Sequence, residues 1–361
     1  MEQRYDIVVV GAGMAGASLG AALGGRARIL VIEAEDRPGY HSTGRSAAFW
    51  TESYGGPGVQ PLTTASGPML RELGVLAPRA ALTLGREGQE ADVADFAARY
   101  RDIGVEVELL DRAGIERHVP RLRPGWSCGA LEPSCCDIDV AGLHQHYLAQ
   151  GRRTGVDLWC RAALAGAQRI PAGWMLALSD GRRVECGILV NAAGAWADAV
   201  ARIAGVRPIG ITPYRRTVVQ LAVSAAVPAD LPLVLDISES FYFKPESGRL
   251  WLSPHDETPS AACDAAAEEI DIAIAIDRFE HVVDWRIERL EHRWAGLRSF
   301  TPDRLPVYGF APQDAAFFWF AGQGGFGIQT APAAADLAAR LLLAEPGGAV
   351  DPQPYSPSRF S

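Results

Sequence analysis

Three glycines near the N-terminus have the spacing of a dinucleotide-binding turn. Gly11, Gly13 and Gly16 follow an apolar run and precede the small apolar residues 14–23, which are typical of a helix packed closely on a sheet. Such glycines let the backbone approach a pyrophosphate at the positive end of that helix. Glu33 lies 22 residues after Gly11, at the end of the next apolar run, where its carboxylate can accept hydrogen bonds from ribose hydroxyls. These residues predict a dinucleotide-binding β-α-β unit.

Two further segments indicate which dinucleotide to expect. Residues 41–48 (HSTGRSAA) place hydroxyls, a glycine and an arginine directly after the second apolar run. Residues 321–330 (AGQGGFGIQT) place several glycines between another apolar run and the helical stretch 331–343. The N-terminus of that helix can stabilise the negative charge that collects on a reduced flavin. Because a simple NAD-binding domain needs no second site of this kind, the two segments favour FAD over NAD.

The composition excludes several other classes of protein. The chain has 361 residues, of which 48% are hydrophobic and 21% charged, and its formal net charge is −9. This acidic balance argues against binding to the phosphate backbone of nucleic acids. The six cysteines form no CxxC pair and no zinc-type spacing with histidines, so no metal site is expected. Without a signal sequence or a run of 18 apolar residues, we expect a cytoplasmic protein with no transmembrane segment.

The order of the expected elements predicts an α/β fold with two domains. Apolar runs followed by glycine and a helix recur at 187–194 and 316–321, as in buried parallel strands. The middle of the chain instead mixes short alternating strands with charged helical stretches, including a helix expected over 268–289. A discontinuous, Rossmann-like FAD-binding domain is expected over 1–80, 137–210 and 299–361. An α+β substrate-binding domain with a mainly antiparallel sheet is expected over 81–136 and 211–298.

Five motifs resemble those of a known enzyme family. They are VVVGAGMAGAS, IEAEDRPGYHSTGRSAA, LVNAAGAWAD, WAGLRSF and AGQGGFGIQT, in this order along the chain. Together they resemble the D-amino acid oxidase family of FAD proteins, and within it the bacterial D-arginine dehydrogenases. The resemblance implies that FAD is held by Gly11, Gly13, Ala15, Gly16, Glu33, Ser42, Thr43, Arg45, Ser46, Ala48, Ala193, Gly194, Trp196, Gly324, Gly325, Gly327, Ile328 and Gln329. No cysteine lies between Arg298 and Gln329, where some relatives bind flavin covalently, so non-covalent FAD is expected.

The same resemblance assigns residues to the substrate. Arg216 and Arg298 match the arginines that hold an α-carboxylate in this family, and a guanidinium fork pairs bidentately with a carboxylate. From the residues alone, a buried ion pair for Arg298 and an exposed strand position for Arg216 remain open. The other residues expected around the substrate are Tyr54, Tyr242, Glu87, Phe49, Gly325 and Gln329.

Glu87 and Phe49 bear on the side chain of the substrate. Glu87 is the best match to the acid that receives a cationic side chain, although its surroundings are charged and loop-like. A solvated loop acid, or Glu90 in the pocket instead, is the alternative. Phe49 stands where the resembling dehydrogenases have histidine, which would shift substrate choice toward apolar or bulky side chains or change the pH dependence of amine oxidation. The other histidines are expected in surface or packing roles.

We therefore expect an FAD-dependent dehydrogenase of D-amino acids, D-arginine-like or broad in specificity. Hydride transfer from Cα to flavin N5 would give an imino acid, which water hydrolyses to a 2-oxo acid and ammonia. Two alternatives stay open: oxidation of another carboxylate, such as glycine, sarcosine or a 2-hydroxy acid, and a flavoprotein that needs a partner subunit. The resemblance implies a quinone or respiratory-chain electron acceptor, reached by transient contact with the inner membrane, while use of oxygen stays open.

Overall fold

The first apolar run of the chain forms the central strand of a parallel sheet. The computed structural model describes residues 3–224 and 227–361. The parallel strands, in spatial order, are β20 (Asp314–Ala321), β12 (Arg183–Asn191), β1 (Gln3–Val10), β2 (Ile29–Ile32) and β9 (Asp157–Trp159). Because β2 lies on one side of β1 and β12 on the other, the order of strands reverses at β1. Ligands of open parallel sheets bind at such a reversal, beyond the carboxyl ends of the strands.

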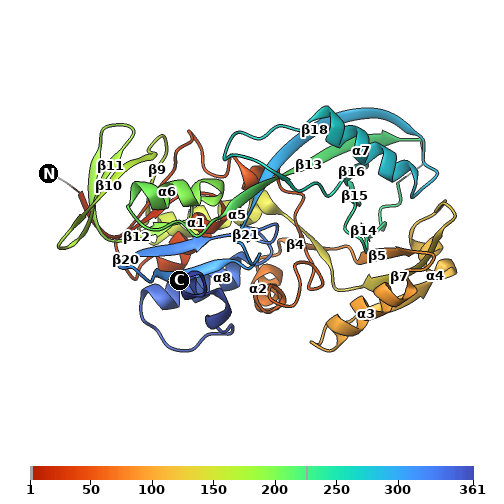
Figure 1. Ribbon diagram of the computed structural model, residues 1–361, viewed down its shortest axis with the longest axis horizontal. Coiled ribbons are helices and arrows are strands. Elements are labelled where there is room, and N and C mark those ends of the chain that lie inside the picture. Colours follow the sequence, from red (N-terminus) through yellow and green to blue (C-terminus); the bar gives the residue numbers. More distant parts are fainter. Residues whose placement is uncertain (1–2, 225–226) are drawn as a thin grey trace.

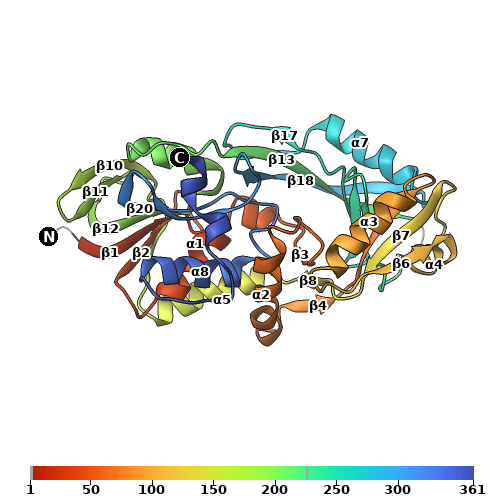
Figure 2. The same ribbon diagram turned by 60° about the horizontal axis from the view of Figure 1, so that its bottom comes forward.

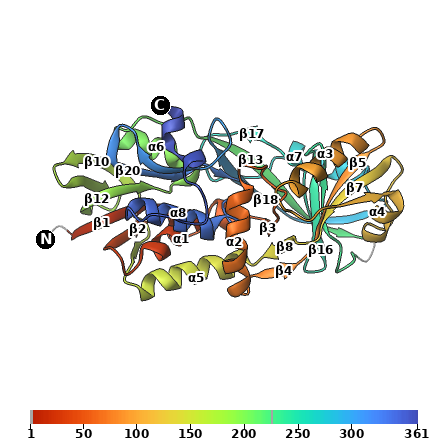
Figure 3. The ribbon, with the colours of Figure 1, turned by 90° about the horizontal axis from the view of Figure 1, so that it is seen from below.

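Both faces of this sheet are covered, which explains its continuous apolar strands. Ile7 and Val9 pack with helices on one face, where α1 and its neighbours lie side by side (Figure 3). Those helices are α1 (Met14–Leu23), α2 (Gln60–Glu72), α5 (Val140–Arg153) and α8 (Ala331–Leu342). Val8 and Val10 face the other side. There the cover consists of α6 (Ala197–Ile203) and the hairpin of β10 (Leu164–Ile170) and β11 (Gly173–Leu178), while β19 (Val307–Ala311) pairs with β20 at the edge.

A ten-stranded sheet forms the second lobe of the molecule (Figure 1). Its main path runs through β21 (Gln323–Gly324), β18 (Ile287–Phe300), β13 (Thr212–Val223), β16 (Arg249–Ser253), β15 (Tyr242–Glu246), β14 (Leu233–Asp236), β5 (Ala81–Arg86), β7 (Trp126–Glu132) and β6 (Glu108–Asp111), with β17 (Thr258–Pro259) beside β13. All neighbours are antiparallel except β14 and β5. The helices of this lobe are α3 (Glu90–Arg101), α4 (Arg112–His118) and α7 (Glu269–Glu280).

The two faces of the second sheet differ in polarity. Leu82, Val219 and Phe243 point to one face, where they form an apolar core with residues of α7. Successive side chains of a strand alternate between faces, so their neighbours along the chain emerge on the opposite side. That opposite face carries Arg216 and Tyr242, and it is the face that meets the first lobe.

A small sheet and two long strands connect the lobes. The sheet consists of β3 (Phe49–Trp50), β8 (Cys136–Ile138) and β4 (Leu76–Pro78), and Figure 2 shows it between the lobes. Strands β13 and β18 run from one lobe to the other (Figure 1). No helix among the described residues is long and apolar enough to cross a membrane.

The predicted α/β fold class is confirmed, while one predicted element is wrong. The helix expected over 268–289 ends at Glu280, because Trp285 turns into the apolar core and Ile287 begins β18. Of the charged residues in that stretch, Glu288 and Arg289 instead lie exposed on β18, which pairs with β13. The predicted domain boundaries stay a prediction. Strands of the parallel sheet come from 3–32, 157–191 and 307–321.

Candidate active site

A cavity of about 480 Å³ opens at the carboxyl ends of the parallel strands and reaches the polar face of the second sheet. Four segments contribute most of its wall, and each follows a strand of the parallel sheet: residues 11–15, 33–49, 192–196 and 323–329. The predicted residues that line it are Gly11, Gly13, Ala15, Glu33, Ser42, Thr43, Arg45, Ser46, Ala48, Phe49, Tyr54, Ala193, Gly194, Trp196, Arg216, Tyr242, Arg298, Gly324, Gly325, Gly327, Ile328 and Gln329. Segments far apart in the sequence thus meet at one site.

The glycine turn is close-packed in the way that the sequence predicts. Gly11 has a φ of +102°, and a Cβ added there would lie 2.6 Å from the carbonyl oxygen of Ala192. A Cβ on Gly16 would lie 1.8 Å from the carbonyl oxygen of Gly11. Gly16 is not among the residues that line the cavity, so it serves the packing of α1 against the turn. The turn therefore leaves room for a ligand that the backbone can approach closely.

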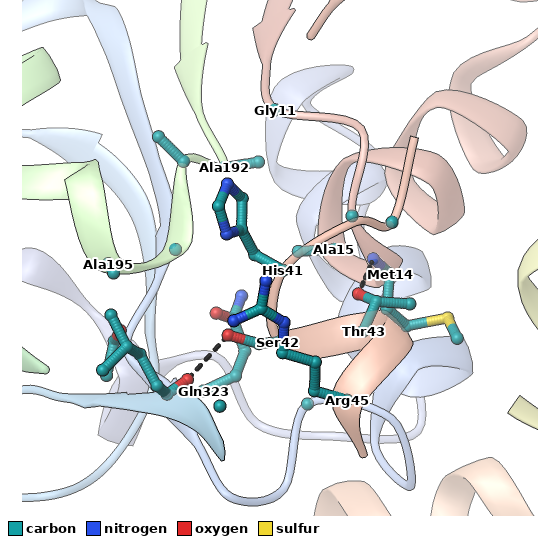
Figure 4. Close-up of a pocket in the computed structure, with 18 of the residues that line it drawn as sticks. Gly11, Met14, Ala15, His41, Ser42, Thr43, Arg45, Ala192, Ala195 and Gln323 are labelled. Carbon is teal, nitrogen blue, oxygen red and sulfur yellow. Dashed lines mark hydrogen bonds between the residues drawn. The ribbon is translucent and has the colours of Figure 1, made fainter. Parts of the chain in front are cut away.

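Side chains from three other elements hold the glycine turn in place. Glu33 accepts a hydrogen bond from the Ala12 N–H at 2.8 Å, and His144 of α5 contacts the carbonyl oxygen of Ala12 at 2.9 Å. Thr43 accepts a hydrogen bond from the Met14 N–H at 2.9 Å (Figure 4). This bond ties the loop of residues 41–48, called the second loop, to the first turn of α1. The two predicted cofactor segments are therefore parts of one wall.

The second loop also contacts the other lobe. The hydroxyl of Ser42 donates to the carbonyl oxygen of Leu297 in β18 at 2.7 Å (Figure 4). Arg45 donates to the carbonyl oxygen of Ala265 at 2.7 Å and forms an ion pair with Asp264. The loop thus bridges the two sheets and encloses the cavity between them.

These residues fit FAD. The backbone can approach a pyrophosphate at Gly11, and the carboxylate of Glu33 lies at the end of β2 where an adenosine ribose binds in such sheets. Buried Nδ1 of His41 has no hydrogen-bond partner among the described residues, and its ring lines the same cavity. The cavity continues from there past 323–329 to the polar face of the second sheet, where the predicted substrate residues lie; this is the predicted substrate end of the cavity. A cavity of this extent suits a large two-part cofactor.

Two arginines, the buried Arg216 and the partly buried Arg298, meet at this end of the cavity. Arg298 donates to the hydroxyl of Tyr54 at 2.7 Å. Arg216 is only 3% exposed and donates through Nε to the carbonyl oxygen of Asp256 at 2.8 Å and through Nη2 to Glu257 at 3.2 Å. Its Nη1 is buried and has no hydrogen-bond partner among the described residues. A buried guanidinium with an unused donor favours an anionic ligand.

The local charges support that conclusion. Burial lowers the pKa of Arg216, and the neighbouring cation of Arg298 lowers it further. Glu257 also pairs with Arg304, through contacts of 2.8 and 2.9 Å, so it is shared between two cations. An added carboxylate would relieve the repulsion between these two neighbouring guanidinium groups.

Gly325 allows Arg298 to reach the cavity. A Cβ on Gly325 would lie 2.9 Å from Arg298 Nη1, so any larger residue would press on the guanidinium. Gln329 donates to the Thr63 hydroxyl at 2.9 Å and to the carbonyl oxygen of Tyr54 at 3.3 Å. The glycine-rich segment thus positions both sides of the Arg298–Tyr54 pair.

The backbone that carries Tyr54 is held by a buried carboxylate. Glu132 of β7 is 2% exposed and accepts from the Thr51 hydroxyl at 2.5 Å. It also accepts from the N–H groups of Glu52 and Ser53 at 2.8 and 3.1 Å. A strand of the second sheet therefore holds the loop of residues 51–54, which places Tyr54 at the cavity.

Glu87 does not reach the cavity. It lies exposed in the turn between β5 and α3, and its N–H donates to the carbonyl oxygen of Gly125 at 2.9 Å. Glu90 is also exposed and accepts from the Ser127 hydroxyl at 2.7 Å. The turn that carries Glu87 follows the end of β5 and leads into α3, and this position is exposed to solvent. The structure does not bring Glu87 to the cavity, and its assignment to a cationic substrate side chain stays a prediction. Neither acid lines the cavity.

Sequence reasoning missed Glu132 and His255. Glu132 is separated from Thr51 by 81 residues, and no local pattern links the two. His255 lies next to Tyr242. The sequence held a signal for this proximity in the hairpin that joins their two strands. β15 and β16 are joined by the two residues Ser247 and Gly248, both with positive φ, as in a tight hairpin. That register places Tyr242 opposite Ser253, two residues before His255.

No group of three or more His, Cys, Asp or Glu side chains suited to a metal ion occurs in residues 3–224 and 227–361. The site therefore consists of a backbone cradle, two arginines and a set of aromatic rings. Comparison with known proteins identifies the family in which this combination occurs.

The sequence model of the family described as "DAO: FAD dependent oxidoreductase" matches residues 6–341. The chain belongs to this family. The family resemblance predicted from the five motifs is confirmed, and with it FAD as the cofactor.

Two curated proteins align along all or nearly all of the chain. The hydrogen cyanide synthase subunit HcnC of Pseudomonas aeruginosa is 25% identical over 412 residues, which cover 100% of this chain and 97% of HcnC. Glycine oxidase of Geobacillus kaustophilus is 26% identical over 370 residues, covering 95% of this chain and 94% of that enzyme.

Solved structures show the same fold. The crystal structure of glycine oxidase from Geobacillus kaustophilus superposes with a TM-score of 0.87 at 23% identity and covers 99% of both chains. That of L-proline dehydrogenase from P. horikoshii also gives a TM-score of 0.87, at 21% identity, covering 100% of this chain and 98% of the other. The fold of this chain is thus shared with both structures.

Proposed function

We propose that this DAO-family protein is a dehydrogenase of D-amino acids that binds the α-carboxylate of its substrate between Arg216 and Arg298. The observation that carries the proposal is the unused Nη1 donor of Arg216, buried beside a second guanidinium at the substrate end of the cavity. One carboxylate there would accept from both arginines, and the Tyr54 hydroxyl could donate to it as well.

The residues of the chain bind and orient the substrate. When bound, FAD supplies the acceptor for the hydride that leaves Cα. The two cations favour the form of the substrate with a neutral amine, because an ammonium group would add a third positive charge. Loss of the hydride and of an amine proton leaves an imino acid, which water hydrolyses to a 2-oxo acid and ammonia.

No residue that lines the substrate end is proposed as a base. His255 is the nearby imidazole, but burial and the cations of Arg216 and Arg298 lower its pKa to about 2. An imidazole with so low a pKa is a poor proton acceptor at neutral pH. The amine proton is therefore expected to leave to water.

The D configuration of the proposed substrate rests on the family resemblance of the sequence motifs. The aligned relatives support a second candidate function. Oxidation of glycine or a secondary amino acid such as sarcosine would use the same carboxylate clamp, and a glycine oxidase aligns with almost the whole chain. HcnC is named as a subunit of a larger synthase, so activity that depends on a partner is the remaining alternative.

Product analysis tests the proposal. Purified holoenzyme is given D-methionine, L-methionine, glycine, sarcosine or D-lactate, with oxygen, a soluble quinone or a redox dye as electron acceptor. The proposal expects a 2-oxo acid and ammonia in equal amounts from D-methionine. Glyoxylate formed from glycine or sarcosine, with no product from D-methionine, would select the second candidate. The yields with the three acceptors report whether oxygen or a quinone takes the electrons.

A further inference from the structure

We propose that Phe49 and His255, with Tyr54 and Tyr242, form an aromatic box that holds the side chain of the substrate, and that this box accepts uncharged side chains and rejects cationic ones. The proposal rests on the carboxylate clamp of the proposed function and adds the class of side chain. Phe49, Tyr54 and Tyr242 line the cavity, whereas His255 lies behind the two tyrosines and acts as a positioning residue.

The four rings close into a cycle. Phe49 contacts Tyr54 and Tyr242 edge-on, with centroids 5.2 and 6.1 Å apart. His255 contacts the same two tyrosines edge-on, with centroids 6.4 and 5.8 Å apart. Edge-to-face contacts of this kind fix ring orientation. Each tyrosine is therefore held from two sides by another ring.

The cycle is built from separate parts of the fold. Phe49 belongs to β3, Tyr54 to the loop held by Glu132, and Tyr242 to β15. His255 follows β16 with a φ of +54°, which is strained for a residue with a Cβ, and its N–H donates to the Ser253 hydroxyl at 3.1 Å. Such a conformation persists only where the surrounding structure holds it, so the position of the imidazole is specified by the fold.

The acids nearest the box are already paired. Asp256 lies 4.0 Å from Arg216 and accepts from the Thr217 N–H at 2.7 Å, and Glu257 is shared between Arg216 and Arg304. Arg216 and Arg298 stand beside the tyrosines, and His255 is neutral. The only carboxylates among the described lining residues are Glu33 and Glu35, which lie at the end of β2 beside the glycine turn. A cationic side chain in the box would therefore lie near two guanidinium groups, with no carboxylate among the described residues around it left unpaired to balance it.

Two further acids near the box, Asp137 of β8 and Glu132 of β7, are also paired. Asp137 accepts from Lys244 at 2.7 Å and pairs with Arg79 at 2.7 Å. Glu132 is occupied by the backbone and hydroxyl groups of residues 51–53. Neither can neutralise a substrate cation without breaking these contacts.

Unreactive carboxylates separate binding from chemistry. Oxidised holoenzyme is titrated with hexanoate and with 6-aminohexanoate, which differ in the terminal ammonium group, and binding is followed by the change in the flavin absorbance spectrum. We expect hexanoate to bind at least about tenfold more tightly, because a hydrophobic pocket discriminates strongly against a buried charge. Anaerobic reduction of the flavin by D-norleucine and D-lysine, which differ by nearly the same group, should show the same order.

Matched variants test the two new residues. Phe49→Glu should reverse the preference in favour of 6-aminohexanoate, whereas Phe49→Leu should keep it. His255→Ala should weaken hexanoate binding several-fold and His255→Phe should not, because only the second keeps a ring against both tyrosines. Glu87→Gln should leave the ratio of the two affinities unchanged.

The outcomes distinguish the two proposals. Equal or tighter binding of 6-aminohexanoate in the unmutated protein would overturn the aromatic box, as would no response of the flavin spectrum to either carboxylate. A preference for hexanoate with no flavin reduction by any amino acid would support the box while contradicting the proposed function. If Glu87→Gln lowered the affinity for 6-aminohexanoate but not for hexanoate, Glu87 would contact a cationic side chain in the bound state, which would contradict the box.

Discussion

Two adjacent arginines in β13 point to opposite faces of the second sheet, because successive side chains of a strand alternate. Arg215 points to α7, where it pairs with Asp271 at 3.0 Å and also with Glu268. Arg216 points to the opposite face and into the cavity, with one donor unused. The sequence alone could not decide between these roles, because the two residues have the same type and the face of each depends on the register with β18.

Substitution of either arginine by lysine tests this difference. Arg216→Lys should lower kcat/KM by a factor corresponding to about 2 kcal/mol or more, the scale for loss of a charge-assisted hydrogen bond. Arg215→Lys should change kcat/KM little, because its loss affects an ion pair on the far face of the sheet. Steady-state kinetics of both variants give the comparison, and equal losses would contradict the clamp.

At the scale of elements, the loop that carries Tyr54 depends on a strand of the other lobe. Glu132 accepts hydrogen bonds from this loop and has almost no exposed surface. A buried acceptor of this kind is costly to lose, because its donors are then left without partners.

We expect Glu132→Gln to lower the free energy of unfolding by about 1–3 kcal/mol, because the amide places an N–H group against existing donors. It should also raise KM several-fold, because Tyr54 loses its fixed position beside Arg298. Glu52→Gln is the control, because the Glu52 carboxylate accepts a hydrogen bond from the Thr64 hydroxyl of α2 and does not hold the backbone of the loop. Chemical denaturation and steady-state kinetics measure the two effects, and a KM equal to that of the control would rule out the positioning role.

Elements with local signals could be predicted, and contacts between distant elements could not. The helix predicted over 14–23 is α1 as observed, because a strand, glycines and small apolar residues mark it locally. The register of β13 with β18 is set by pairing between segments far apart in the sequence. For that reason the sequence could not place Glu132 or direct Glu87, while the glycine segments could be predicted from their own composition.

For the whole molecule, two histidines with lowered pKa values should make the free energy of unfolding depend on pH. Burial lowers the pKa of His144, and burial with two nearby arginines lowers that of His255 to about 2. In the unfolded chain both imidazoles take up a proton near the ordinary histidine pKa of 6.5, whereas in the folded protein they take it up only at lower pH. The free energy of unfolding is therefore fully retained above pH 6.5 and declines as the pH falls below that value, because protonation then favours the unfolded chain.

His255→Gln should remove one of these contributions. Between pH 7 and pH 5 the unmutated protein should lose about 2 kcal/mol more stability than this variant, from about 1.4 kcal/mol per pH unit below the ordinary pKa. His292→Gln, at an exposed position, should follow the unmutated protein. Denaturant unfolding at saturating FAD across this range gives the slopes. Equal slopes for His255→Gln and the unmutated protein would show that His255 is protonated in the fold.

The most direct test of the proposed activity is an anaerobic absorbance spectrum of the purified holoenzyme. D-methionine is added first, and L-methionine is added to a separate sample. The oxidised flavin absorbs near about 450 nm, a property of the cofactor. We expect D-methionine to abolish this band and L-methionine to leave it unchanged. Loss of the band with the L-amino acid alone, or with neither, would contradict the proposal of a D-amino acid dehydrogenase.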